Sequence, residues 1–319
     1  MASSTSPSEP ASGTPRLALR LLATAVVTWA ACASYTVRLN PEVRFFHAVH
    51  RAKLEWEPQV GPTNRVLFVA GSSCMTSLDP VHLEKEHGIH ALNLGLGAGM
   101  GPRFLARYAL DRARPGDRML LSFEQGLLAG TVGWDSLGVQ FAAAIGRPDL
   151  LGGPDGYGFT STLLSLRPGG YHVFTLLGKL ALRQPLYRYG AAEVRPGGWH
   201  AVAARRPVES PGILPDALSP QAREWLRELK AECDRKGIEV AYTPPWLYGS
   251  GHDASAMREA NLRFLADVGT VLPVLRDEEL GVHTEVGDYA DTVAHPTPEG
   301  AAVNTDRLAR MVEGWLGRR

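Results

Sequence analysis

The pattern of apolar and polar positions becomes regular after residue 64. Short apolar runs there predict strands at residues 66–70, 90–94, 118–123, 238–243 and 270–275. Apolar residues at helical spacing predict helices at 80–87, 102–114, 220–236, 254–268 and 299–316. Short, continuously apolar strands separated by helices are typical of a parallel sheet covered on both faces. The sequence therefore predicts a doubly wound α/β domain of about five strands over residues 64–319.

Residues 126–215 interrupt this alternation. They are rich in Gly and Pro, with short helical patches such as 171–182. We interpret them as an insertion over the sheet. The insertion is either a cap near the active site or a packing element without a part in the chemistry.

The chain before the sheet domain divides into three segments. Residues 1–15 are rich in Ser, Pro and Thr and predict a disordered tail. Residues 16–37 begin with basic residues and continue as an uncharged, mostly apolar run, which is about long enough to span a bilayer. Residues 38–63 contain three prolines among mixed residues and predict a stalk with one short helix.

The apolar segment 16–37 fits more than one role. A single-pass anchor is the interpretation we favour. Ala31-Cys32-Ala33 also fits a cleavage pattern, which would release a secreted or periplasmic protein. A lipid-modified Cys32 fits less well after Trp29, and a buried core helix is the remaining alternative. Basic residues stand on both sides, so the positive-inside rule sets no orientation. Because long domains are translocated regardless of flanking charge, we expect an extracytoplasmic domain.

Composition narrows the function classes. The chain has 33 basic and 33 acidic residues, so no net field attracts nucleic acid. Its three cysteines form no C-x-x-C pair, which argues against a disulfide framework or a structural zinc site. No H-E-x-x-H or clustered His/Cys spacing occurs. We therefore expect no metal and no other cofactor.

The first predicted strand runs into a serine turn, AGSSC at residues 70–74. Ligands of doubly wound sheets bind at the carboxyl ends of the strands, so this turn is well placed for chemistry. A serine after a strand is often only a helix N-cap. As a nucleophile, it needs a base that is oriented by a third group.

A distant motif supplies those partners. Asp291 and His295 stand four residues apart, directly before the last predicted helix. An acid and a histidine on one short loop can fix the imidazole tautomer. Asp288 is the alternative acid.

Two further turns carry candidate chemistry. GLGAGMG at residues 95–101 follows the second strand, but its spacing fails the G-x-G-x-x-G pattern. This disfavours a nucleotide-binding oxidoreductase. The Gly95 N–H is instead a candidate donor to a developing oxyanion. In the third turn, the Gln125 amide can donate, whereas an ionised Glu124 cannot.

Together these blocks resemble the SGNH/GDSL hydrolase superfamily in its membrane-anchored bacterial variant. The resemblance lies in AGSSC at residues 70–74 with SLDP at 77–80, in NLG at 93–95, and in DTVAH at 291–295 with EG at 299–300. It implies a flavodoxin-like sheet, Ser72 as nucleophile with Ser73 as second choice, and His295 and Asp291 as base and acid. It also implies an oxyanion hole at Asn93 and Gly95, which Gln125 would complete.

The chain departs from the superfamily at two points. Its last block has one residue more than D-x-x-H, and Glu124-Gln125 replaces the Gly-x-Asn-Asp block. The resemblance still implies a serine acyl hydrolase or O-acyltransferase that acts on an acylated envelope carbohydrate or small ester. A membrane-bound acyltransferase is its implied partner. The alternative is a non-catalytic protein that assists envelope polysaccharide modification.

Overall fold

The computed structural model describes residues 14–133, 135–152, 156–167, 170–203 and 206–317. The predicted tail lies almost wholly outside these residues. The protein is a mixed α/β structure with 55% helix. Its helices are α1 (Thr14–Arg38), α2 (Pro41–Trp56), α3 (Ser72–Ser77), α4 (Pro80–His87), α5 (Pro102–Leu110), α6 (Gln125–Ala129), α7 (Ser136–Ala144), α8 (Phe159–Ser165), α9 (Gly170–Ala181), α10 (Pro220–Arg235), α11 (Ala254–Val268) and α12 (Pro298–Leu316).

The central sheet is parallel and has the strand order β2-β1-β3-β4. Two small two-stranded sheets, β5-β6 and β7-β8, accompany it. The strands are β1 (Val66–Val69), β2 (Ala91–Asn93), β3 (Arg118–Leu121), β4 (Glu239–Tyr242), β5 (Leu247–Tyr248), β6 (Val282–His283), β7 (Tyr289–Thr292) and β8 (His295–Pro296). Four of the predicted strands are thus confirmed, with somewhat shorter bounds.

The fifth predicted strand, at residues 270–275, is not a strand in the structure. Tyr242 and Val274 form only an isolated parallel bridge. Pro273 interrupts this segment, and a proline has no N–H to donate to a sheet ladder. The central sheet of the described chain therefore has four strands.

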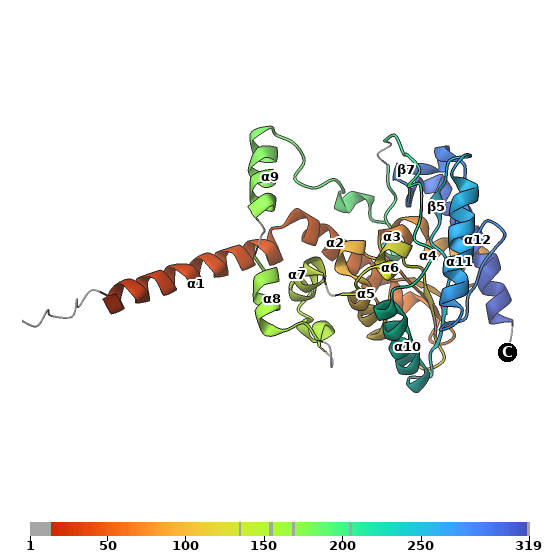
Figure 1. Ribbon diagram of the computed structural model, residues 1–319, viewed down its shortest axis with the longest axis horizontal. Coiled ribbons are helices and arrows are strands. Elements are labelled where there is room, and N and C mark those ends of the chain that lie inside the picture. Colours follow the sequence, from red (N-terminus) through yellow and green to blue (C-terminus); the bar gives the residue numbers. More distant parts are fainter. Residues whose placement is uncertain (1–13, 134, 153–155, 168–169, 204–205, 318–319) are drawn as a thin grey trace, which may run out of the picture.

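Successive strand residues face two different hydrophobic cores. Leu67 and Val69 belong to one core, together with side chains of α5 and α10. Val66 and Phe68 belong to the other core, together with side chains of α4 and α12. This alternation is what period-two strands produce when helices cover both faces of a sheet. Figure 1 shows α11 and α12 at the end of the molecule opposite α1.

The predicted stalk at residues 38–63 is wrong, because most of it is the helix α2, which packs into the core. Phe45, Phe46 and Val49 are buried and join the core around α5. A Cβ at Gly97 would lie 2.6 Å from the Phe46 ring, so this glycine admits the aromatic side chain. Apolar residues at helical spacing thus outweigh the prolines at the two ends of this segment.

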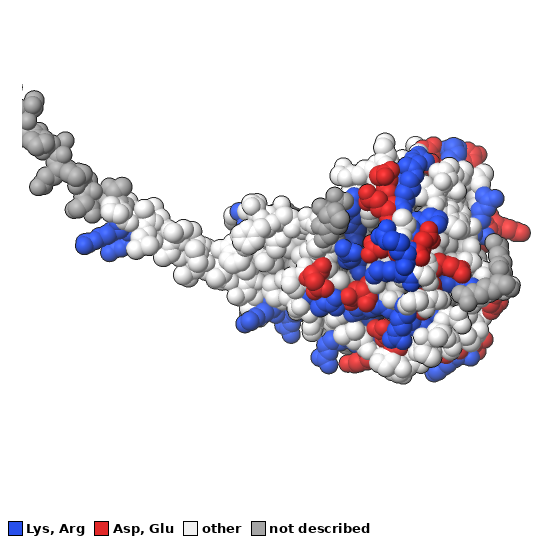
Figure 2. Space-filling model, turned by 90° about the horizontal axis from the view of Figure 1, so that it is seen from below, with Lys and Arg blue, Asp and Glu red and all other residues white. Residues whose placement is uncertain are grey.

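Helix α1 extends away from the rest of the molecule (Figure 1). Residues Pro15–Arg38 are long and apolar enough to cross a membrane, and 6% of the most apolar window is buried. The segment is therefore not a buried core helix, and it fits a membrane anchor or a signal sequence. Figure 2 shows α1 almost free of charged residues beyond its beginning, whereas charged side chains gather on the globular part.

Candidate active site

Ser72 stands where β1 ends and α3 begins, with Gly71 as the N-cap of that helix. Its Oγ lies 2.9 Å from Nε2 of His295, 223 residues away in the sequence. The neighbouring Ser73 is buried, and its Oγ has no hydrogen-bond partner in the described chain. The turn therefore brings Ser72, and not Ser73, to the histidine.

The antiparallel pair β7-β8 places the acid beside the base. Thr292 is paired with His295, and this tight turn brings Asp291 back alongside the imidazole. Nδ1 of His295 lies 3.0 Å from Oδ1 of Asp291. Asp288, the alternative acid, instead lies 2.7 Å from Nε2 of His283. Ser72, His295 and Asp291 thus form one continuous chain of hydrogen bonds.

Two residues of the insertion complete the surroundings of Asp291. Its Oδ2 accepts hydrogen bonds from the Tyr189 hydroxyl at 3.0 Å and from Nη1 of Arg188 at 2.9 Å. Burial raises the pKa of this carboxyl, but the hydrogen bond from His295 and the contacts of Tyr189 and Arg188 bring it below its ordinary value. The ionised acid can therefore hold the proton of the imidazole on Nδ1, which leaves Nε2 free to accept from Ser72.

Neither Tyr189 nor Arg188 was identified from the sequence. Both lie in the irregular part of residues 126–215, and no motif there marks them. The centroid of the Tyr189 ring lies 4.6 Å from that of the His200 ring and 6.1 Å from that of the His295 ring. At least this part of the insertion adjoins the candidate site.

Tyr189→Phe should lower ester turnover about 10- to 100-fold, the effect of losing one hydrogen bond to a buried charge. The ring would keep its packing while Asp291 loses a donor. Steady-state kinetics with p-nitrophenyl acetate measure the effect. Tyr157→Phe is the matched control, since the hydroxyl of Tyr157 bonds to Ser165 instead. Equal rates for Tyr189→Phe and the unmodified protein would contradict a role in holding Asp291.

The polar groups of residues 93–95, the second predicted block, are engaged in hydrogen bonds within the protein. The Asn93 amide nitrogen donates to the carbonyls of Cys74 and Leu78, and its Oδ1 accepts from the Gly95 N–H at 3.0 Å. Asn93 thereby fastens α3 to the end of β2. In this arrangement neither Asn93 nor the Gly95 N–H is directed to a ligand.

Gly95 is required for the close approach of the two turns. A Cβ there would lie 2.6 Å from the backbone nitrogen of Met75. Gly95→Ala should therefore destabilise the protein by about 1–3 kcal/mol, the cost of overpacking. Urea unfolding measures this, with Gly126→Ala as control because nothing lies within 4 Å of its Cβ position. Equal losses in both variants would contradict the close-packing role.

In the third turn, Gln125 does not take the predicted place in the oxyanion hole. The Gln125 side chain is buried and donates to Oδ1 of Asn261, which in turn donates to the Leu280 carbonyl. The structure does not bring it to the triad. Oε2 of Glu124 is instead buried without a hydrogen-bond partner in the described chain, 3.0 Å from the Cβ position of Gly71. A carboxyl group, rather than an amide, therefore stands next to the serine turn.

A buried cation lies beneath the second block. Lys53 of α2 donates from Nζ to the Asn93 carbonyl at 2.5 Å and to the Gly198 carbonyl at 2.9 Å. Burial lowers its pKa from 10.5 to about 7. Sequence patterning gave no sign of this residue. It connects α2, directly after the apolar segment, to the turn that carries Gly95.

The free energy of unfolding should rise with pH because the folded state lowers the pKa of Lys53. Its pKa is about 7 in the folded protein and ordinarily 10.5, so the unfolded chain binds this proton more tightly. Below pH 7 the folded state carries the full cost of a buried ammonium. This cost disappears as the pH rises from about 7 to 10.5, and the free energy of unfolding increases over the same range. Lys53→Met should flatten the rise in urea-unfolding free energy, whereas Lys230→Met, at an exposed ion pair, should keep it. An unchanged slope in Lys53→Met would contradict the prediction.

Comparisons with known protein families, with curated proteins and with solved structures find no match for this chain. The resemblance to the SGNH/GDSL superfamily therefore rests on the sequence blocks alone.

Proposed function

We propose that this protein is a membrane-anchored, extracytoplasmic serine acyl hydrolase or O-acyltransferase of the SGNH type, on a doubly wound sheet. The observation that carries the proposal is the hydrogen-bond chain from Ser72 through His295 to Asp291. These are the residue types, order and distances that serine acyl transfer uses. The serine lies 223 residues from the histidine, yet the fold places the base within hydrogen-bond reach of the serine and the acid within reach of the base, as activation of a serine nucleophile requires.

The proposed reaction has two steps. Ser72 Oγ attacks the acyl carbonyl while His295 Nε2 takes the serine proton, and the tetrahedral intermediate collapses as His295 protonates the leaving alcohol. Water or a sugar hydroxyl then attacks the acyl-serine, with His295 again moving the proton. Asp291 stabilises the imidazolium in both steps. The Ser72 N–H, at the start of α3, is the leading oxyanion donor, since the Gly95 N–H is bonded to Asn93.

The substrate class and location extend the proposal. The anchored relatives that the sequence blocks resemble suggest an acylated envelope carbohydrate and a membrane-bound acyltransferase as partner. Helix α1 supports anchoring rather than cleavage, because its Trp29 donates a hydrogen bond to the Leu163 carbonyl of the globular part. Cleavage after Ala33 would remove this contact.

A non-catalytic assembly protein is the second candidate, and Glu124 favours it. An ionised carboxyl beside the serine turn would repel a developing oxyanion, where the superfamily block supplies an asparagine donor. Glu124→Gln replaces this carboxyl group with an amide that can donate a hydrogen bond. A rate increase in this variant would support slow catalysis in the natural protein.

Acyl release from a small ester separates the two candidates. The full-length protein in detergent should release p-nitrophenol from p-nitrophenyl acetate in a burst followed by steady turnover, as an acyl-enzyme pathway predicts. Addition of a soluble oligosaccharide should yield an acetylated sugar if the natural step is transfer. No release above that of heat-denatured protein would favour the non-catalytic candidate.

A further inference from the structure

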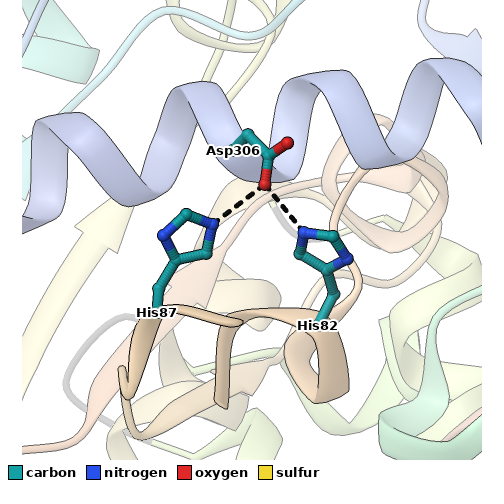
Figure 3. Close-up of side chains that lie close together, drawn as sticks. All are labelled: His82, His87 and Asp306. Atoms are coloured by element: carbon teal, nitrogen blue, oxygen red, sulfur yellow. Dashed lines mark hydrogen bonds and ion pairs between the residues drawn. The ribbon is translucent and has the colours of Figure 1, made fainter. Parts of the chain in front are cut away.

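Two histidines and one aspartate meet on the surface between α4 and α12 (Figure 3). Nε2 of His82 lies 2.7 Å from Oδ1 of Asp306, and Nε2 of His87 lies 2.9 Å from the same oxygen. The three ligand atoms all lie within 4.8 Å of one another. His82 and His87 come from α4 and Asp306 from α12, so more than two hundred residues separate the imidazoles from the carboxylate.

A second carboxylate lies on the outer side of one imidazole. Nδ1 of His87 is 3.5 Å from a carboxylate oxygen of Glu313, and metal-binding histidines commonly have a carboxylate on the side away from the ion. The side chains are 28%, 21% and 43% exposed for His82, His87 and Asp306, so an ion can reach them from solvent.

The geometry points to a binding site for a divalent transition metal ion, with Zn²⁺ the best match, held by Nε2 of His82, Nε2 of His87 and a carboxylate oxygen of Asp306. Two imidazoles and one carboxylate suit zinc, and water would take the fourth tetrahedral position. Hard cations such as Mg²⁺ prefer oxygen ligands and should not compete. Because the ion replaces protons on the imidazoles, binding should weaken as the pH falls.

Such an ion would connect the two elements that follow the catalytic residues. α4 follows the serine helix α3, and α12 begins directly after His295. The Asp79 N–H already donates to Oγ1 of Thr305, so the two helices are joined one turn away from the cluster. The metal site is a structural clamp on this pair of helices, separate from the triad.

Metal binding tests the inference directly. After chelator treatment, the full-length protein in detergent should take up one equivalent of Zn²⁺ in isothermal titration. A saturating excess of Zn²⁺ should raise Tm by about 5 °C, while Mg²⁺ should not. Co²⁺ should give visible absorption bands, a readout that does not depend on catalysis.

Variants separate this site from adventitious binding. His87→Gln and Asp306→Asn should each abolish the saturable uptake and the Tm shift. His252→Gln is the matched control, because His252 also lies beside a carboxylate but is 99% exposed. Absence of saturable uptake, or equal uptake by His87→Gln and the unmodified protein, would overturn the site. If a ligand variant unfolds, the absence of Co²⁺ bands in the unmodified protein would equally overturn the site.

A second observation concerns the depth of α8 relative to the membrane. Trp29 lies about 21 Å along α1 from Pro15, whereas the hydrocarbon core is about 30 Å thick. Trp29 nevertheless donates to the Leu163 carbonyl of α8. If the hydrocarbon core begins at Pro15, Trp29 still lies within it. The part of α8 that contacts Trp29 would then lie inside the hydrocarbon core as well, near its outer boundary.

The surface of α8 and α9 suits that position. Figure 1 shows both helices at the end of the molecule from which α1 emerges. Figure 2 shows a mostly uncharged surface continuing from α1 onto the adjoining part of the molecule. The apolar side chains that this region exposes are Phe159 (79%), Leu164 (52%), Phe174 (77%), Leu177 (56%), Leu180 (54%) and Leu182 (70%).

We infer that α8 and α9 insert their exposed apolar side chains into the same leaflet that α1 crosses, with the lipid bilayer as their partner. This inference rests on the proposed anchor. Burial of large apolar side chains in the acyl region favours insertion, and helices are the elements that tolerate it. The chain segment of residues 126–215, which contains α8 and α9, would then hold the candidate active site close to the membrane surface.

Lipid-quenching measurements distinguish this inference from the anchor itself. In full-length protein with Cys32→Ser, an NBD fluorophore is attached through Val27→Cys, Phe174→Cys or Ile213→Cys, and doxyl-labelled lipids in phosphatidylcholine nanodiscs serve as quenchers. We expect quenching at 27 and 174 but not at 213, an exposed apolar control. Quenching at 27 without 174 would overturn the insertion of α9 and leave the anchor intact. No quenching at 27 would overturn the anchor.

Discussion

Ser72→Ala should reduce the hydrolysis of p-nitrophenyl acetate by about 10³- to 10⁶-fold, the range expected when the nucleophile of a serine triad is lost. Of the two serines in the described turn, only Ser72 forms a hydrogen bond with His295. Alanine removes this oxygen and leaves the backbone of α3 in place. The change in kcat should therefore far exceed the change in thermal stability.

Ser73→Ala is the matched control for this prediction. Ser73 is the next residue along the same turn, and its hydroxyl is buried without a partner in the described chain. Its removal should leave kcat within a few-fold of the unmodified protein. A large loss in Ser73→Ala together with normal activity in Ser72→Ala would reverse the assignment of the nucleophile.

Asp291→Asn should lower kcat by about 10⁴-fold, as loss of the orienting acid does in other serine triads. The neutral amide favours the wrong imidazole tautomer and no longer stabilises the imidazolium of His295. Arg188 and Tyr189 would face an amide in place of the carboxylate whose Oδ2 they share. The loss should therefore appear mainly in kcat rather than in KM.

Asp288→Asn is the control for the acid. Asp288 lies three residues earlier and binds His283, not His295. It should retain most of the activity at neutral pH. Equal losses in Asp288→Asn and Asp291→Asn would indicate that both substitutions act through the fold of this loop and would contradict a specific role of Asp291.

The parts of the structure that follow local rules were predictable from the sequence. The four strands of the sheet are short apolar runs with turn residues at their ends, and burial on both faces gives them a strong signal. The serine turn and the Asp291–His295 pair also stand out because each lies in a short segment of the sequence. Their pairing was inferred because a nucleophilic serine needs a base and an orienting acid, and the structure brings them within hydrogen-bond distance.

The features that the sequence missed depend on contacts between distant segments. Residues 38–63 resembled a stalk because of their prolines, but α2 packs its apolar side chains into the core, and Phe46 lies against Gly97 of the second turn. Gln125 was expected at the oxyanion hole, yet Asn261 of α11, far along the chain, takes its amide hydrogen bond. Tyr189 and Lys53 likewise acquire their positions from tertiary packing, which no local spacing encodes.

Labelling with a fluorophosphonate probe tests the proposed chemistry most directly. The probe reacts with serines that an adjacent base has activated, and mass spectrometry of the digested protein then identifies the modified residue. We predict stoichiometric labelling at Ser72, which His295→Ala abolishes. Labelling at Ser73, or no labelling of the folded full-length protein, would contradict the assignment of Ser72 as an activated nucleophile.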